Sequence, residues 1–416
     1  MGRLKIVYPV CCGMDVHRDF VIACIASTNA QGVTEYQSRR YSTYSGGLRD
    51  LRDWLVSNNC LDVCMESTGK YWFPVHNILE MSCHVVVSHP KFVKAIKGKK
   101  TDKKDAQWIA DLFKHDLVRG SFIPPNDIRQ LRDLCRYWCK LTAYMTGEKN
   151  RAQNCLTVSN FKLDDVFSNV FGKSASAIIT QLLEHPGVTF DVAPFVDGRC
   201  HTPIAQIQEA VDGSFAPEQA EKLKIIRSHL DFLEELKLNV ESEILGIAKN
   251  YLPQIELLLT APGINEPMTA IRILAEIGTD MTVFETAKHL TSWAGLTPQN
   301  NESAGKKKTT RIGKAGAYIK PLLVQVALAA SRSDKHPEMK AKHLILKKRR
   351  GGKKATIAIA RKILTAIYHM LLKGEAYNPC LYAREDKPPA SRQITAEQAL
   401  LLVAKMGFVI VNPVPA

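Results

Sequence analysis

Short apolar runs alternate with segments of helical periodicity over residues 7–114, and this order constrains the fold more than any other feature. Five runs have the length and composition of strands: 7–14, 20–26, 36–43, 61–65 and 84–88. Three segments space their apolar residues as amphipathic helices do: 46–58, 71–81 and 102–114. The order β-β-β-α-β-α-β-α predicts an α/β layer in which helices pack on a mixed sheet.

This order of elements is that of an RNase H-like fold, which we expect for residues 1–124. Pro124 and Pro125 mark its end, since consecutive prolines interrupt both helices and strands. The remaining chain is predicted to be mainly helical: a coiled-coil domain at 125–252 with an insertion at about 155–220, a helical domain at 253–375, and a tail at 376–416. The predicted fold class is therefore α/β plus all-α.

A long helix with heptad character is predicted in the second domain. Apolar residues alternate three and four apart from Leu223 to Tyr251, and only Lys237 breaks the pattern. About four heptads of this kind favour a coiled coil. A second helix is predicted from Ile128 to Met145. These two helices can pack on one another as an antiparallel pair, or the heptads can form a dimer contact, and the sequence leaves both open.

The charge of the chain favours a nucleic-acid partner. Lys and Arg number 56 against 41 acids, for a formal charge of +15, and they cluster at 91–104, 306–311 and 340–362. The alternative is a solvated basic surface. The first apolar stretch is too short for a signal peptide and no uncharged apolar run reaches about 18 residues. We therefore expect no membrane partner and a cytoplasmic, nucleoid-associated protein of prokaryotic type, whose eleven irregularly spaced cysteines stay reduced.

Four acids in the first quarter of the chain are the strongest candidates for chemistry. Asp15 follows the first predicted strand, Glu66 follows the fourth, and Asp102 and Asp105 share one face at the start of a helix. Two-metal phosphodiester chemistry needs several carboxylates within about 4 Å of two cations. The alternatives are a turn residue at Asp15, half of an ion pair at Glu66, a helix cap at Asp102 and a surface acid at Asp105.

Around these acids the chain resembles a known family. Gly-Met-Asp-Val-His, Met-Glu-Ser-Thr-Gly-Lys-Tyr-Trp and Lys-Thr-Asp-Lys-Lys-Asp-Ala are similar to the RuvC-like domain of DEDD transposases of the insertion sequence one-ten family. Residues 258–333 resemble the family's second domain, through Pro-Gly-Ile, Glu-Ile-Gly, Trp-Ala-Gly-Leu-Thr-Pro and Glu-Ser-Ala-Gly-Lys. The resemblance implies that Asp15, Glu66, Asp102 and Asp105 are catalytic and bind Mg²⁺, as two ions for which Mn²⁺ can substitute.

The resemblance also implies that Ser303 is a nucleophile, which forms a covalent phosphoserine link to a DNA strand. From the residues alone, a loop serine without chemistry is the simpler interpretation, because a serine hydroxyl needs a nearby metal or base. The family further implies donor and target DNA, a structured bridge RNA that guides recombination, and a homo-oligomer, dimer or tetramer. The expected function is an RNA-guided DNA transposase or recombinase. The alternative is a RuvC-like structure-specific endonuclease that uses metal-activated water.

Basic residues near these motifs are candidates for phosphate contacts, which position a backbone without reading its sequence. They flank the acids, follow the serine, or lie in a turn predicted between two C-terminal helices. They are Lys97, Lys99, Lys100, Lys103, Lys104, Lys306, Lys307, Lys308, Arg311, Lys347, Lys348, Arg349, Arg350, Lys353 and Lys354. The alternative for the predicted turn is simple solvation. No base-reading motif is evident, which fits sequence recognition delegated to a guide RNA.

Overall fold

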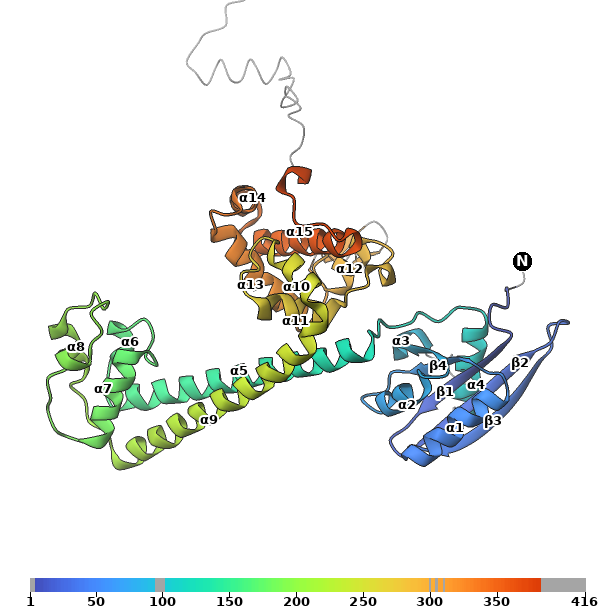
Figure 1. Ribbon diagram of the computed structural model, residues 1–416, viewed down its shortest axis with the longest axis horizontal. Helices are drawn as coiled ribbons and strands as arrows, with labels where there is room; N and C mark the ends of the chain where they lie inside the picture. Colours follow the sequence, from blue (N-terminus) through green and yellow to red (C-terminus); the bar gives the residue numbers. More distant parts are fainter. Residues whose placement is uncertain (1–3, 94–101, 299–300, 304–305, 310, 383–416) are drawn as a thin grey trace, which may run out of the picture. The chain divides into compact units, whose positions relative to one another are not determined.

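A mixed five-stranded sheet forms the centre of the first of two units, Met1–Pro125 and Asn126–Ala416, in the computed structural model (Figure 1). The structure describes residues 4–93, 102–298, 301–303, 306–309 and 311–382. The strands are β1 Val10–Val16, β2 Phe20–Thr28, β3 Thr34–Ser42, β4 Asp62–Glu66 and β5 His84–Ser88. Their order is β3-β2-β1-β4-β5, with β1 antiparallel to β2 and parallel to β4. The predicted mixed α/β region and helical remainder are confirmed at this level.

Helices cover both faces of the sheet (Figure 1). On one face, α1 Ser45–Ser57 and α2 Trp72–Leu79 bury an apolar stripe against the strands, because their apolar residues recur at helical spacing. On the other face lies α4 Asp102–Lys114, which turns Ile109 and Phe113 inward. One short helix, α3 Pro90–Val93, was not expected from the sequence.

Two long helices open the second unit and pair within the chain. They are α5 Asn126–Val158 and α9 Pro217–Ala248. The Nε1 of Trp138 on α5 donates to Glu241 on α9 at 3.3 Å, and Glu148 lies 3.1 Å from His229. Trp138 pairs with Glu241 and the later residue Glu148 pairs with the earlier residue His229, so the two helices run antiparallel. The sequence left open whether these helices pair within the chain or form a dimer contact, and the structure shows that they pair within the chain.

The interruption of the heptads at Lys237 has a structural role. The ammonium of Lys237 lies 4.4 Å from the centroid of the Trp138 ring on the facing helix. A cation over an indole face is attracted by the negative charge density of the ring. The aliphatic stem of Lys237 is half-buried in the same place, so the lysine takes the position of an apolar heptad residue while it keeps its charge.

Short helices form the insertion between α5 and α9. They are α6 Leu163–Val166, α7 Lys173–Glu184, η1 Ala193–Phe195 and α8 Ile204–Ala210. They share one apolar cluster with the ends of the two long helices, in which Phe161 and Ile178 are fully buried. The cluster explains why a segment with few long apolar runs still folds, since its core is completed by α5 and α9.

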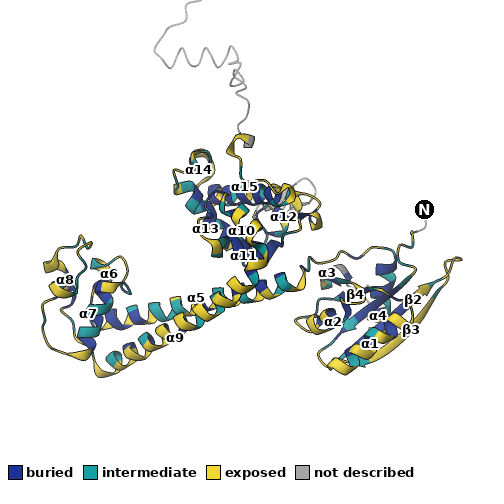
Figure 2. Cartoon of the chain, viewed as in Figure 1, coloured by how far each residue is buried: buried dark blue, intermediate teal, exposed yellow. Residues whose placement is uncertain are grey.

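The rest of the second unit is a group of helices around α15 Gly352–Lys373 (Figure 2). The others are η2 Lys249–Tyr251, α10 Leu252–Leu259, α11 Pro267–Ile277, η3 Met281–Val283, α12 Ala287–Trp293, α13 Ile319–Arg332, α14 Pro337–Arg350 and η4 Pro379–Tyr382. Among the helices of the described ranges, α15 alone is long and apolar enough to cross a membrane. Its most apolar window is 56% buried against its neighbours, as in a core helix.

The Pro-Gly turn between α10 and α11 packs inward. Gly263 has φ +80°, and a Cβ placed there would lie 2.2 Å from the carbonyl oxygen of Val326 on α13. A glycine is needed because both the positive φ and the close approach exclude a side chain. Since Pro262 is also buried, the turn acts as a helical corner of the core.

One element was not predicted, and one prediction of local structure was wrong. The helical domain at 253–375 also contains the antiparallel pair β6 Asn301–Ser303 and β7 Lys306–Thr309. The basic cluster at 347–354 was expected in a turn, but it occupies helix ends, with Gly351 as the joint between α14 and α15. Lys and Arg are good helix formers, so a run of them continues a helix until a glycine ends it.

Beyond α15 the chain remains attached to the helical core as far as the described residues extend. The hydroxyl of Tyr377 donates to Glu338 on α14 at 3.0 Å, and its backbone N–H donates to Thr260. Most of the predicted tail, residues 383–416, lies outside the described residues.

Candidate functional site

The site begins with alternate residues of β1, and with the residue directly after it, on the side that faces α4. Gly13, Asp15 and His17 are two apart, so their side-chain positions point to one face of the sheet. Gly13 lets the helix come very close, because a Cβ there would lie 2.2 Å from the carbonyl oxygen of Ala106 and 2.3 Å from the amide nitrogen of Ala110. Because Gly13 has no side chain, α4 can approach β1 closely enough to place Asp102, at the start of the helix, beside the end of the strand.

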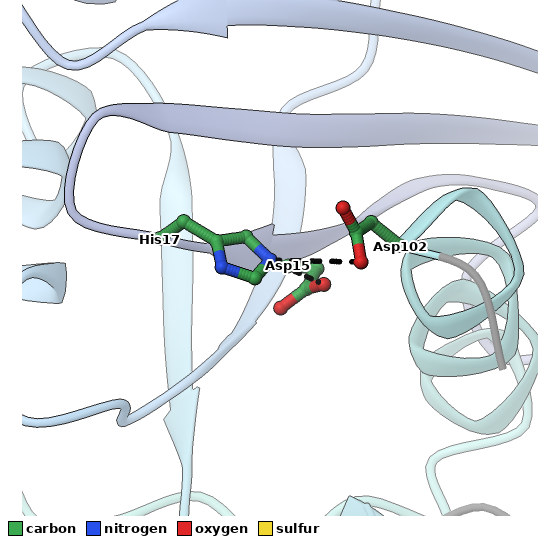
Figure 3. Close-up of side chains that lie close together, drawn as sticks. All are labelled: Asp15, His17 and Asp102. Atoms are coloured by element: carbon green, nitrogen blue, oxygen red, sulfur yellow. Dashed lines mark hydrogen bonds and ion pairs between the residues drawn. The ribbon is translucent and has the colours of Figure 1, made fainter.

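Three side chains converge at this point (Figure 3). The Nε2 of His17 lies 3.0 Å from Oδ2 of Asp15 and 3.9 Å from Oδ1 of Asp102. One ligand atom from each residue can be chosen so that all lie within 4.8 Å of one another. The side chain of Asp15 is 17% exposed, whereas those of His17 and Asp102 are 41% and 52% exposed. The group is therefore anchored in the domain and open to solvent on one side.

Burial is the main influence on the ionisation of Asp15. Loss of solvent raises the pKa of this carboxyl above its ordinary value, and the contact with His17 opposes that shift. The negative charges of Asp102 and Asp105 raise the pKa further. A cation bound between these carboxylates would relieve their mutual repulsion. Unbalanced negative charge of this kind favours the binding of a metal ion.

Glu66 and Asp105 lie beside this group. Met14 of β1 pairs with Met65 of β4, and one more step of this parallel register brings Glu66 level with Asp15. Cys64 pairs with Gly13, so Glu66 shares the face of Asp15. Asp105 is half-buried in the first turn of α4 and contributes through its charge. The structure thus gathers the four predicted acids at one edge of the sheet, with Asp15 and Asp102 in the tightest group.

The contacts of His17 have the length expected between two ligands of one divalent cation. Two ligands that each lie about 2.1 Å from one ion are at most about 4.2 Å apart. The two distances from His17 Nε2, 3.0 Å and 3.9 Å, fall within that span. Sequence reasoning missed His17, although it lies two residues after Asp15, directly beyond the end of β1, and alternation there places both on one face. Asp15, Asp102 and His17 are therefore the described residues best placed to hold a metal.

The predicted nucleophile lies in the second unit. Ser303 ends β6 and is paired in register with Lys306 of β7. The side chains of 301–309, and so those of Lys306, Lys307 and Lys308, lie outside the described part of the structure. Arg311 follows the hairpin and is exposed, and the neighbouring Ile312 extends the pairing through a bridge to Pro298. The hairpin gives the serine a defined backbone position.

The predicted basic residues outside the hairpin segment fall into three sets. Lys97, Lys99 and Lys100 lie outside the described residues. Lys103 and Lys104 are exposed on the first turn of α4, between the two acids. The third set is exposed at the joint of α14 and α15: Lys347, Lys348, Arg349, Arg350, Lys353 and Lys354.

The joint of α14 and α15 has unusual electrostatics. Basic residues in the last turn of α14 suit the negative end of its dipole. Lys353 and Lys354 instead lie in the first turn of α15, where the dipole is positive and no acidic residue is present. Helix stability alone disfavours that arrangement, whereas an anionic ligand such as a phosphate favours it.

An α/β domain with clustered carboxylates, joined to basic helices, defines a class of enzymes that act on nucleic acids with a metal. Comparison with known sequences is more specific. Residues 12–160 match the model of the IS110-type DEDD transposases, and residues 255–344 match the transposase IS116/IS110/IS902 family. The chain belongs to the IS110 family of DEDD transposases, as its motifs predicted. This membership indicates a DNA substrate and dependence on a divalent metal.

Curated relatives agree with this assignment. The transposase for insertion sequence element IS1111A of Coxiella burnetii is 25% identical over 330 residues, which are 76% of this chain and 79% of the relative. The pilin gene-inverting proteins of Moraxella bovis and Moraxella lacunata are each 32% identical over 124 residues, or 29% of this chain and 38% of theirs. The protein is accordingly a DNA transposase or recombinase.

Proposed function

We propose that the chain is an RNA-guided recombinase that cuts DNA at the acidic group and rejoins it through a phosphoserine at Ser303. The observation that carries the metal-dependent part is the convergence of Asp15 and Asp102 at one edge of the sheet in a member of a DEDD family. The strand order β3-β2-β1-β4-β5, with parallel β1, β4 and β5, supports an RNase H-like fold for the domain that carries these acids.

Mg²⁺, or Mn²⁺ in its place, would supply Lewis-acid stabilisation of the charge that develops on the phosphate. Asp15 and Asp102 would hold the cation, while Glu66 and Asp105 complete the negative field around it. Lys103 and Lys104 would hold the DNA backbone beside the acids. Ser303 would attack the phosphorus, lose its proton and release a strand end as a hydroxyl. The bond energy would be kept in the phosphoserine for rejoining.

The decisive test of the serine is Ser303→Ala in a strand-exchange assay with Mg²⁺. Loss of both the covalent protein–DNA adduct and recombination is expected. The matched control is Ser331→Ala, which removes a hydroxyl that donates to the Leu328 carbonyl of its own helix. If Ser303→Ala still cleaves DNA and yields free ends, water is the nucleophile and the chain is a structure-specific endonuclease. If it still recombines, the phosphoserine mechanism is wrong.

The guide RNA is proposed on the basic joint of α14 and α15, whose exposed lysines and arginines suit a phosphate backbone of any sequence. Purification of the full chain from cells that carry its own element, followed by sequencing of the bound RNA, tests this. One discrete structured RNA is expected. Recovery of only heterogeneous cellular RNA, together with recombination by RNA-free protein, would refute guidance.

A homo-oligomer is proposed through α9. Besides the residues that pack on α5, this helix exposes two apolar pairs, each at heptad spacing: Ile225 with Phe232, and Leu238 with Leu245. Phe232 and Leu238 are six residues apart, so the two pairs face different sides of the helix. An exposed apolar pair at heptad spacing on a paired helix suits a partner helix. Light scattering of the double variant Phe232→Glu, Leu245→Glu should show monomers where the parent forms dimers or tetramers. A monomeric parent would refute the oligomer.

We also propose the four-domain division at 1–124, 125–252, 253–375 and 376–416, which limited proteolysis tests.

A further inference from the structure

The contact with Asp15 alone does not explain the position of His17. One ring nitrogen, Nε2, approaches both Asp15 and Asp102, at 3.0 Å and 3.9 Å (Figure 3). A histidine that served only to bond Asp15 would need one short contact. The second approach brings the same nitrogen close to both a strand carboxylate and a helix carboxylate, so that one cation held by both acids would also be within its reach.

The ring of His17 is held by the hairpin between β1 and β2. The backbone N–H of His17 donates to the Phe20 carbonyl at 2.9 Å, which closes a turn of two residues. The imidazole and the Phe20 ring then stack with centroids 4.5 Å apart and planes inclined by 25°. The guanidinium of Arg40 on β3 lies 3.9 Å from the Phe20 centroid. Arg40 pairs with Ile22 of β2, and this pairing sets it on the same part of the sheet.

This arrangement resembles the way in which ligand histidines are prepared in metal sites. Their ring orientation is fixed by groups outside the coordination shell, so little rotamer entropy remains to be lost when the ion binds. Here the orientation comes from an aromatic stack that is itself covered by a cation. A side chain 41% exposed would otherwise sample several rotamers.

We propose that His17 Nε2 is a direct ligand of the same metal ion that Asp15 and Asp102 hold, and that Phe20 and Arg40 are positioning residues for its ring. The inference rests on the proposed metal centre and adds a nitrogen to it. It also predicts metal preference. Imidazole binds first-row transition ions better than it binds Mg²⁺, so the site favours Mn²⁺ over Mg²⁺ more strongly than carboxylates alone would.

Electron paramagnetic resonance of the full-length protein with Mn²⁺ reads the ligand directly. A nitrogen bound to Mn²⁺ gives a ¹⁴N hyperfine coupling in pulsed spectra, and labelling with ¹⁵N-histidine changes that coupling in a known ratio. We expect the coupling in the parent protein and its conversion on labelling. Bound Mn²⁺ without a histidine coupling would overturn the proposal for His17.

His17→Phe is the sharpest variant, because it removes both ring nitrogens and keeps an aromatic ring to stack on Phe20. We expect loss of the coupling and a rise of at least about tenfold in the Mn²⁺ Kd, with a smaller rise for Mg²⁺. The matched control is His84→Ala. His84 also lies 3.0 Å from a carboxylate of the same sheet, that of Asp62, but at the start of β4 and β5. Its loss should leave coupling and Kd unchanged.

Two further results separate this proposal from the metal centre on which it rests. Asp15→Asn should weaken Mn²⁺ binding strongly. If Asp15→Asn leaves binding unchanged, the metal centre itself is wrong, and the assignment of His17 falls with it. If Asp15→Asn abolishes binding while His17→Phe keeps both the parent Kd and the parent spectrum, the centre stands and His17 is no ligand. Phe20→Leu should retain the coupling and weaken binding, as expected for a positioning residue.

Discussion

Gly13 has no side chain, and this lets the backbone of α4 pack closely against β1. Gly13→Ala tests how far the site depends on this close approach. The new Cβ would lie 2.2 Å from the Ala106 oxygen, about 1.2 Å short of the 3.4 Å at which ordinary contact begins. Both close atoms belong to the backbone of α4, so no side chain can rotate away. The helix must therefore shift by about 1 Å or more, and overpacking of this kind costs roughly 1–3 kcal/mol of stability.

Such a shift moves Asp102 away from Asp15, although every acid is retained. A misplacement of about 1 Å can lower a catalytic rate by roughly 10²-fold. We expect Gly13→Ala to lose stability in urea denaturation and activity in strand exchange with Mg²⁺. Gly46→Ala is the control, since a Cβ on this residue of α1 meets nothing within 4 Å and should leave stability equal or higher by up to about 1 kcal/mol. A Gly13→Ala protein with parental stability and activity would refute the close approach of α4.

Three other perturbations have defined outcomes. Because burial raises the pKa of Asp15, the contribution of this group to stability is present at low pH and is lost as the pH rises through the raised pKa. Asp15→Asn should therefore raise the Tm at neutral pH in EDTA, while it abolishes activity. An unchanged or lower Tm would contradict burial as the cause of the pKa shift. The pair Lys353→Glu, Lys354→Glu should weaken nucleic-acid binding and reduce the slope of log K against log salt by roughly 1–2, whereas an unchanged slope would show that neither lysine contacts phosphate. Glu276→Ala removes a carboxylate that is 8% exposed and accepts from Arg136 at 2.7 and 2.9 Å; a loss of about 3 kcal/mol is expected in chemical denaturation, and a loss below about 1 kcal/mol would mean that the pair adds little.

The strands and helices of the first unit were predictable because their apolar residues follow periods that each element imposes. The helix from Asp102 to Lys114 was foreseen with its inward residues, since Ile109 and Phe113 lie four apart. The hairpin β6–β7 was not foreseen, because Lys-rich strands pair through their backbones and leave no apolar alternation. The role of Lys237 was also hidden, since its partner Trp138 is 99 residues away and periodicity describes only one helix at a time.

The sequence allowed us to name the four acids as candidates, but it did not give the distances between them. Gly13 shows why. Alternation along β1 and into the residue directly after it supplies three different things to one face: room for a helix, a carboxylate and an imidazole. A motif of acids specifies only the second. The distance between Asp15 and Asp102 depends on how closely α4 approaches, so a variant that keeps all four acids and fills the space at Gly13 should resemble the loss of an acid. Variants of Phe20 or Arg40 should instead affect the metal that is preferred, because they change the ring and leave the helix in place.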